Sequence, residues 1–156
     1  MSEFDEIANA AIASAQDLVH QGRQYESATA HIMGSHFEIT VVGSQSISVD
    51  GLIQYLTNLE SLWSRFLPTS EISYLNWHAG TSCAVSDETR LLVDKLHDGY
   101  LRTNGLFDPT TLPQTIAHGY ATSHSDPSRV TVLPDSAKWP GDMQGIVIDD
   151  NAGTVT

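Results

Sequence analysis

The sequence predicts an α+β fold, in which antiparallel strands pack with helices. Apolar residues recur every three or four positions over residues 52–66, as in a helix with one buried face. Residues 36–42 instead alternate polar with apolar, as in a strand with one buried face. The chain has 156 residues, of which 40% are apolar and 17% charged. We therefore expect one globular domain, or a large piece of a bigger one.

The N-terminal segment, residues 1–26, is expected to be an amphipathic helix followed by a polar linker. The helix is predicted over residues 2–20, where apolar side chains recur at helical steps. These side chains are Phe4, Ile7, Ala11, Ala15 and Leu18. We expect this stripe to pack on the body of the domain, residues 27–156, and an arm that binds a partner is the alternative.

A hairpin and a helix are predicted next. Residues 27–33 and 36–42 are expected to be two paired strands joined at Gly34. Asp50 is the expected N-cap of the following helix, and Pro68 its stop. The apolar face of that helix is predicted to be Leu52, Ile53, Leu56, Leu59, Leu62, Trp63 and Phe66. Residues 69–80 show no clear period and are expected to be irregular.

A further helix is predicted to begin after Ser86, whose hydroxyl can cap free backbone amides, and to end at Asn104-Gly105. Its apolar face is expected to be Leu91, Leu92, Leu96 and Tyr100. Pro109 and Pro113 predict a loop, and residues 130–133 a short strand. Residues 145–149 and 154–156 are predicted to be strands joined by a turn at residues 150–153, and the acidic pair Asp149-Asp150 is expected to form a turn rather than a magnesium site. Because the last strand would leave pairing groups unmatched, we expect an incomplete domain.

The charge of the chain limits its partners. Seven Lys and Arg against nineteen Asp and Glu give a net charge of −12. This charge argues against nucleic acid and against an anionic membrane surface, because both are bound through Lys and Arg. The single cysteine, Cys83, cannot form an intrachain disulfide, and no stretch is long and apolar enough to span a membrane. A soluble, cytoplasmic protein is expected.

The histidines and the cysteine suggest no site on their own. His31 with His36, His78, and His118 with His124 lack a compact ligand spacing, so structural or solvent-facing histidines are favoured over a zinc-type site. Cys83 is expected to be a half-buried strand thiol rather than a nucleophile. The sequence contains no Gly-x-Ser-x-Gly, Gly-x-Gly-x-x-Gly or Walker-type motif.

Residues 103–113 are the most informative stretch, because they combine a helix end, an aromatic ring, a carboxylate and two prolines. Such a stiff loop suits a flat heteroaromatic ligand, with Phe107 offering a ring face and Asp108 a hydrogen-bond acceptor. A packed turn without a ligand is the alternative.

Four segments, taken in order, resemble the ApbE family of magnesium-dependent FAD:protein FMN transferases. Met-Gly-Ser-His-Phe at residues 33–37 is similar to the family's Met-Gly-Thr-x-Phe. Residues 64–76 resemble its Ser-x-Phe/Tyr-x-x-x-Ser-Glu segment, which ends in Asn. Thr-Asn-Gly-Leu-Phe-Asp-Pro-Thr at residues 103–110 resembles its Thr-x-Gly-x-Phe-Asp-x-Thr block. His-Gly-Tyr at residues 118–120 stands where the family commonly has Trp-Gly-Phe. The resemblance covers residues 28–156.

The resemblance implies the N-terminal half of an ApbE-like, T-fold-like domain. It further implies FAD as substrate, Mg²⁺ as cofactor, and transfer of FMN to a Thr or Ser hydroxyl of a target flavoprotein with release of AMP. The positions that match FAD contacts are Met33, Phe66, Leu106, Phe107 and Asp108. Ser70 and Asn76 match positions of loop architecture. Catalytic residues and metal ligands are expected downstream of residue 156, and a non-catalytic FAD-binding or scaffold module is the alternative.

Overall fold

A computed structural model describes residues 3–43, 46–134 and 141–156, with the side chains of residues 3–9, 11 and 15 outside that description. The chain forms two compact units, residues 1–57 and 58–156. Both contain helices, and the strands of both pair antiparallel, which confirms the predicted α+β class. The expected boundary at residues 26–27 lies within the first unit. No helix of the described residues is long and apolar enough to cross a membrane.

The first unit begins with a helix and a hairpin. Helix α1 (Glu3–His20) confirms the predicted N-terminal helix and contacts strand β2 (Ser35–Val42). Leu18 is half-buried, whereas the predicted stripe side chains Phe4, Ile7, Ala11 and Ala15 lie outside the described residues. Strand β1 (Tyr25–Ile32) pairs antiparallel with β2, from Tyr25 opposite Val42 to Ile32 opposite Ser35. The linker is therefore shorter than predicted, because residues 25 and 26 complete this ladder.

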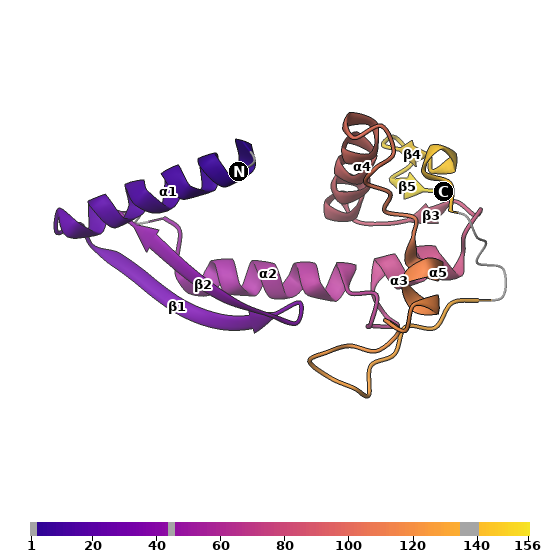
Figure 1. Ribbon diagram of the computed structural model, residues 1–156, viewed down its shortest axis with the longest axis horizontal. Coiled ribbons are helices and arrows are strands. Elements are labelled where there is room, and N and C mark those ends of the chain that lie inside the picture. The colour runs from indigo at the N-terminus through magenta and orange to yellow at the C-terminus, as the bar shows by residue number, and fades with distance from the viewer. Residues whose placement is uncertain (1–2, 44–45, 135–140) are drawn as a thin grey trace. The chain divides into compact units, whose positions relative to one another are not determined.

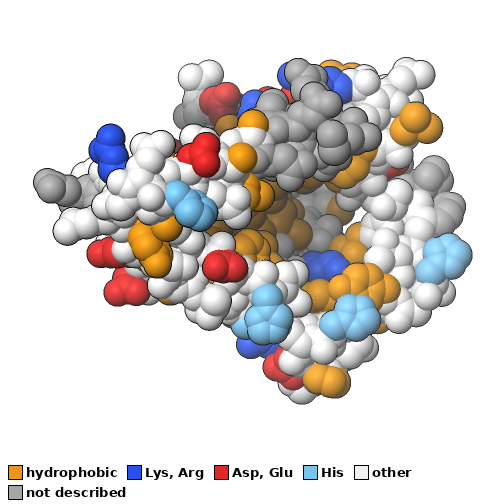
Figure 2. All heavy atoms as spheres, turned by 60° about the vertical axis from the view of Figure 1, so that its left-hand side comes forward, with side chains coloured by type: hydrophobic (Ala, Val, Ile, Leu, Met, Phe, Trp, Pro, Cys, Tyr) orange, Lys and Arg blue, Asp and Glu red, His pale blue; other side chains and the backbone are white. Residues whose placement is uncertain are grey.

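The turn of the hairpin consists of Met33 and Gly34, with φ angles of 54° and 73°. Two positive φ angles fit a two-residue type I′ turn, whose twist matches that of the paired strands. One face of the hairpin is apolar and partly buried, and the other is polar and exposed. His31 and His36 lie opposite each other on the exposed face, and Figure 2 shows histidine side chains at the surface on the side it draws.

Helix α2 (Val49–Trp63) differs from the prediction at both ends. At its start, Ser48 Oγ accepts a hydrogen bond of 3.1 Å from the Gly51 amide, so Ser48 is the cap. Asp50 lies in the first turn, and its prediction as the N-cap is wrong. The helix ends at Trp63 rather than near Pro68, because the Ser70 hydroxyl donates to the Ser64 carbonyl over 2.7 Å and holds a turn there. Phe66 therefore lies outside the helix.

The second unit contains a helix in the segment predicted to be irregular. Helix α3 (Glu71–Trp77) is capped by Ser70, whose Oγ accepts a bond of 3.1 Å from the Ser73 amide. Ser70 is fully buried, which agrees with its assignment to loop architecture. Seven residues make only two turns, too few to produce a visible apolar period.

Helix α4 (Asp87–Arg102) begins after Ser86, which accepts a bond of 3.2 Å from the Thr89 amide as predicted. Its buried residues are Thr89 and Val93, four positions apart on one face. Leu91 is 59% exposed, so its prediction on the apolar face is wrong. It lies two residues from both Thr89 and Val93, which is about 200° around the helix axis, so it points away from the buried face. Asn104 and Gly105 follow the helix with φ angles of 52° and 79°, the left-handed conformation expected there.

A small sheet completes the second unit. Strands β3 (Cys83–Ala84), β5 (Thr154–Val155) and β4 (Ile148–Asp149) lie in the order β3-β5-β4, all antiparallel, and α4 contacts β4 (Figure 1). The predicted C-terminal hairpin is present, but its first strand begins at Ile148 rather than at residue 145, because residues 143–145 form a short 3₁₀ helix. Because β5 pairs on both sides, the expectation that its pairing groups would be unmatched is wrong. Cys83 lies on a strand as expected, but it is 3% exposed and therefore fully buried.

Two other predictions in this unit need correction. Pro113 lies in the first turn of helix α5 (Leu112–Ala117) rather than in a loop, because proline needs no amide donor there. The strand predicted at residues 130–133 is only an isolated bridge between Thr122 and Val130. A short 3₁₀ helix, η1 (Met143–Gly145), precedes β4.

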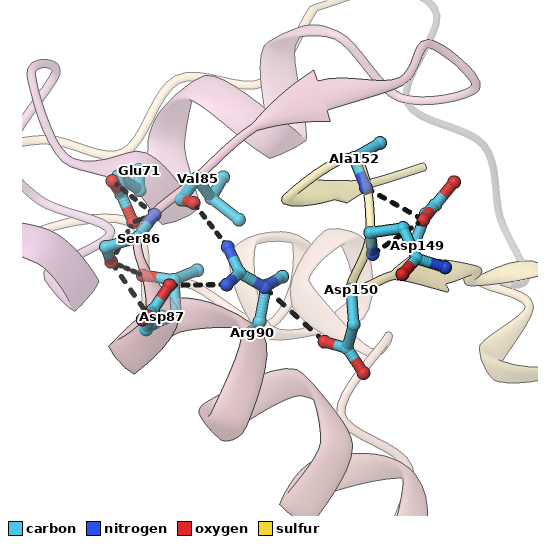
Figure 3. A network of polar contacts seen from close by, with 10 residues as sticks. Glu71, Val85, Ser86, Asp87, Arg90, Asp149, Asp150 and Ala152 are labelled. Atoms are coloured by element: carbon cyan, nitrogen blue, oxygen red, sulfur yellow. Dashed lines mark hydrogen bonds and ion pairs between the residues drawn. The ribbon is translucent and has the colours of Figure 1, made fainter.

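A polar network fixes the start of α4 (Figure 3). The Glu71 carboxylate accepts bonds from the Ser86 amide, at 3.0 and 3.1 Å, and from the Ser86 hydroxyl, at 2.7 Å. The Arg90 guanidinium donates to the Val85 carbonyl over 2.9 Å, pairs with Asp87, and lies 3.5 Å from an oxygen of Asp150. The network joins α3, α4 and the β4–β5 turn, and so holds the helix that leads into residues 103–111.

Candidate functional site

The loop after α4, residues 103–111, is held by its own hydroxyl and carboxylate groups. Thr103 Oγ1 accepts a bond of 2.9 Å from the Phe107 amide. Asp108 Oδ1 accepts bonds from the Thr110 amide, at 2.9 Å, and from the Thr110 hydroxyl, at 2.5 Å. Thr111 Oγ1 donates to the Asp108 carbonyl over 3.1 Å. Because these bonds span only two to four residues each, they fix the backbone of the loop locally.

This loop presents two apolar side chains to solvent. Leu106 is 94% exposed and Phe107 44% exposed. The Phe107 ring packs against Gly99 of α4, where a Cβ would lie only 3.1 Å from ring atom Cδ1. The missing side chain at Gly99 therefore makes room for the ring. The loop offers an apolar surface that a flat ligand could cover.

Asp108 has a divided role. Its Oδ1 is used within the loop by Thr110, whereas Oδ2 accepts no hydrogen bond from the described residues. The side chain is half-buried and ordered by its neighbour. Oδ2 is consequently the oxygen that can accept a hydrogen bond from a ligand.

Phe66 belongs to a second group of side chains, which we call the Arg65 cluster: Arg65, Phe66, Tyr120 and His124. The guanidinium carbon of Arg65 lies 4.0 Å from the centre of the Phe66 ring and 4.6 Å from that of Tyr120. The Phe66 and Tyr120 rings are 6.0 Å apart at 66°, and the Tyr120 and His124 rings are stacked at 5.0 Å. A cation held against two rings is a stabilising arrangement.

Arg65 anchors this cluster through hydrogen bonds. Its Nη1 donates to Thr131 Oγ1 over 2.8 Å, and its Nη2 to the Tyr120 carbonyl over 2.9 Å. Partial burial lowers the pKa of the Arg65 guanidinium, an effect that the contact with Tyr120 opposes. An arginine side chain remains charged under these conditions, so the cluster carries a positive charge in an acidic protein.

A cavity of about 660 Å³ lies within the second unit. Trp63, Arg65, Leu96 and residues 109–113 are among the residues that line it. Its size is within the range of small-molecule sites. None of Phe66, Leu106, Phe107 and Asp108 lines it, but residues 109–113 follow the site loop directly, and Arg65 links the cavity to the ring of Phe66.

The structure places the five predicted FAD-contact positions in three local settings. Met33 lies at the hairpin turn of the first unit, 43% exposed. Phe66 lies in the Arg65 cluster. Leu106, Phe107 and Asp108 are adjacent in the loop after α4. The roles of these residues in binding stay predictions.

Among the described residues, no group of three or more His, Cys, Asp or Glu side chains could hold a metal ion. Mg²⁺ prefers oxygen ligands and is bound through carboxylates. The described residues therefore do not fit a magnesium centre. Asp150 lies in the turn after β4, and Asp149, the last residue of that strand, holds the turn because its Oδ1 accepts bonds from two backbone amides.

Arg65 and Tyr120 were the residues that sequence reasoning did not single out. Both lie within the segments that resemble the family, but neither was assigned a contact. The one local signal is that Arg65 is among only seven Lys and Arg in the chain. The partner Thr131 lies 66 residues away and left no local signal.

Solved structures of ApbE proteins share this fold. The ApbE protein of Thermotoga maritima is 20% identical to this chain, with a TM-score of 0.67 over 85% of this chain and 44% of that one. The flavin transferase ApbE of Vibrio cholerae is also 20% identical, with a TM-score of 0.63 over 86% and 45%. The flavinyl transferase ApbE of Pseudomonas stutzeri is 21% identical, with a TM-score of 0.62 over 85% and 44%. This chain thus spans less than half the length of these structures.

Two further comparisons concern the sequence alone. No curated protein matches the sequence. The model of the ApbE family matches residues 33–152, a span that contains the hairpin turn, the Arg65 cluster and the loop after α4. The chain belongs to the ApbE family.

Proposed function

We propose that this chain supplies part of the FAD site of an FAD:protein FMN transferase. In this reaction a Thr or Ser hydroxyl of an acceptor flavoprotein attacks the phosphorus of the FMN part of FAD. The bond from this phosphorus to the bridging oxygen breaks, AMP leaves with that oxygen, and the hydroxyl proton is released to solvent. The observation that carries the proposal is the family match over residues 33–152, supported by the similar fold of the flavin transferases of Vibrio cholerae and Pseudomonas stutzeri.

The loop after α4 is proposed to form one wall of the nucleotide site. The Phe107 ring rests on Gly99 and keeps its outer side free for an isoalloxazine or adenine ring. Leu106, 94% exposed, would lose water contact when the ligand covers it. Asp108 Oδ2 would accept a hydrogen bond from a ring or ribose donor.

The Phe66 ring, as part of the Arg65 cluster, is proposed to contact the flavin or adenine. Met33, in the hairpin turn, is proposed to make a further contact with FAD. Arg65 would hold the Phe66 ring in place through its contact of 4.0 Å. Mg²⁺ belongs to the proposed reaction as the family implies, but the described residues offer no ligand group for it, and we assign it no step.

The proposal is tested with FAD and Mg²⁺ added to the natural protein that carries this sequence. Binding is followed by flavin fluorescence and AMP release by chromatography. Binding together with AMP release supports the transferase. Binding without AMP supports a non-catalytic FAD-binding module, and absence of binding contradicts both.

A matched pair of variants locates the site. Leu106→Ser should weaken FAD binding, whereas Leu101→Ser, which changes a leucine that is 60% exposed on α4, should not. Both leucines are exposed, so neither substitution removes core packing. Equal effects of the two variants would exclude the loop from the nucleotide site.

A further inference from the structure

His31 and His36 form a directly opposed pair across the hairpin of the first unit. Ile32 and Ser35 flank the two-residue turn and exchange the hydrogen bonds that close it. The next pair, His31 with His36, is therefore of the non-hydrogen-bonded kind, in which the two Cα atoms approach to about 4.5 Å. Side chains at such a pair lie closer together than at any other antiparallel position.

The two imidazole rings have a separation that suits a shared metal ion. Their centres are 5.0 Å apart, with ring planes at 89°. A metal–nitrogen bond of about 2.0–2.1 Å places the metal about 3.2 Å from each ring centre. The two centres are then about 4.5 Å apart for a right angle at the metal and about 5.2 Å for a tetrahedral angle. The observed separation lies between these values.

The surroundings of the pair are open and polar. Both histidines are exposed on the polar face of the hairpin, so an ion from solution can reach their side chains. Glu38 lies two residues beyond His36 on the same face and adds negative charge. Among the described residues there is no third side chain that completes a set of three ligands. The remaining positions on the ion would be filled by water.

We propose that His31 and His36 chelate a late first-row divalent cation such as Zn²⁺ at the turn end of the hairpin. Imidazole nitrogen suits Zn²⁺, Ni²⁺ and Cu²⁺, whereas Mg²⁺ requires oxygen ligands. This site is therefore chemically distinct from the magnesium of the proposed transferase reaction. The bound ion would cross-link β1 and β2 next to Met33.

The test is a titration of the natural protein, free of any affinity tag, with Zn²⁺ alone, followed by calorimetry. We expect a site of one ion per chain that weakens at least tenfold in His31→Ala or His36→Ala. Because either substitution destroys the chelate, the double variant should bind no more weakly than the single variants at this site. Both positions are exposed, so the variants should keep their fold, and circular dichroism verifies this.

His20→Ala is the matched control, since His20 is an exposed histidine of the same unit whose Nδ1 lies 2.7 Å from the Gln16 carbonyl of its own helix. Its Zn²⁺ affinity should equal that of the unchanged protein. Cu²⁺ gives an independent readout, because its paramagnetic resonance spectrum should show two coordinating nitrogens that are lost in the double variant. Zn²⁺ affinity unchanged in the double variant, or no Zn²⁺ binding at all, would overturn the proposal.

Discussion

Replacing Gly99 with alanine should displace the Phe107 ring without lowering the stability of α4. The new Cβ would lie 3.1 and 3.2 Å from Cδ1 and Cε1 of Phe107, whereas carbon atoms in contact prefer about 3.5–4.0 Å. The ring must retreat by roughly 0.5 Å. Because Phe107 is 44% exposed, it can retreat into solvent at little cost. Alanine is also the better helix former, by up to about 1 kcal/mol.

We therefore expect Gly99→Ala to leave the free energy of unfolding unchanged or to raise it by up to about 1 kcal/mol, measured by urea denaturation. FAD affinity, measured by flavin fluorescence, should fall. The ring moves away from Gly99 toward the side that the ligand is proposed to cover, and a misfit of about 0.5 Å or more between ring and ligand removes a quarter to a half of an aromatic contact that contributes about 0.5–1.5 kcal/mol. The expected loss of FAD affinity is thus about 1.2- to 3.5-fold.

A second background makes this test specific. In Phe107→Ala, where the ring is absent, Gly99→Ala should have no further effect on FAD affinity. An equal loss in both backgrounds would show that the ring does not transmit the effect. Destabilisation of the protein by Gly99→Ala would refute the reasoning in another way, because it would mean that the ring cannot move.

Three further predictions concern single side chains. Asp108→Ala should weaken FAD binding several-fold without unfolding the natural protein. Asp108→Asn, which keeps an acceptor for Thr110, should weaken it less. Equal FAD affinity of the unchanged protein and both variants would remove Asp108 from the site. Trp63→Phe should lower the free energy of unfolding by about 1 kcal/mol, because it removes the 3.2 Å bond from Trp63 Nε1 to Thr89 Oγ1; an unchanged denaturation midpoint would contradict this. Hydrogen bonds from Ser128 lower the pKa of Asp126. The resulting stabilisation of the folded state is present above the unfolded pKa of this carboxyl and is lost as the pH falls through its folded pKa. Ser128→Ala should raise the pKa of Asp126 in an NMR titration, and an unchanged pKa would show that other groups lower it.

The elements that could be predicted from the sequence are those whose signals are local. Ser86 caps α4 through an amide three residues away, and Asn104-Gly105 ends it within one turn. The hairpin register follows from the turn at Met33-Gly34 and the alternation beside it. In each case the atoms that interact are close in the sequence, so the residue types alone carry the information.

The parts that were wrong depend on distant contacts or on short segments. Which residues of α4 face inward depends on distant contacts, such as that of α4 with β4 and the bond from Trp63 to Thr89, so the exposure of Leu91 left no trace in its own neighbours. The early end of α2 depends on a bond from Ser70 to Ser64, and Arg65 is anchored by Thr131. For the candidate site, the motifs identified the loop and Phe66, whereas the contact between Arg65 and the rings required the structure. A cytoplasmic location stays a prediction.

The central claim is that the loop carrying Leu106, Phe107 and Asp108 forms a wall of a nucleotide site. A crystal structure of the natural protein with FAD bound tests it most directly. We predict that one ring system of FAD lies against the outer side of Phe107, with Asp108 Oδ2 within hydrogen-bonding distance of the ligand. FAD bound elsewhere in the protein, with Leu106 and Phe107 still facing solvent or covered by other side chains, would contradict the claim.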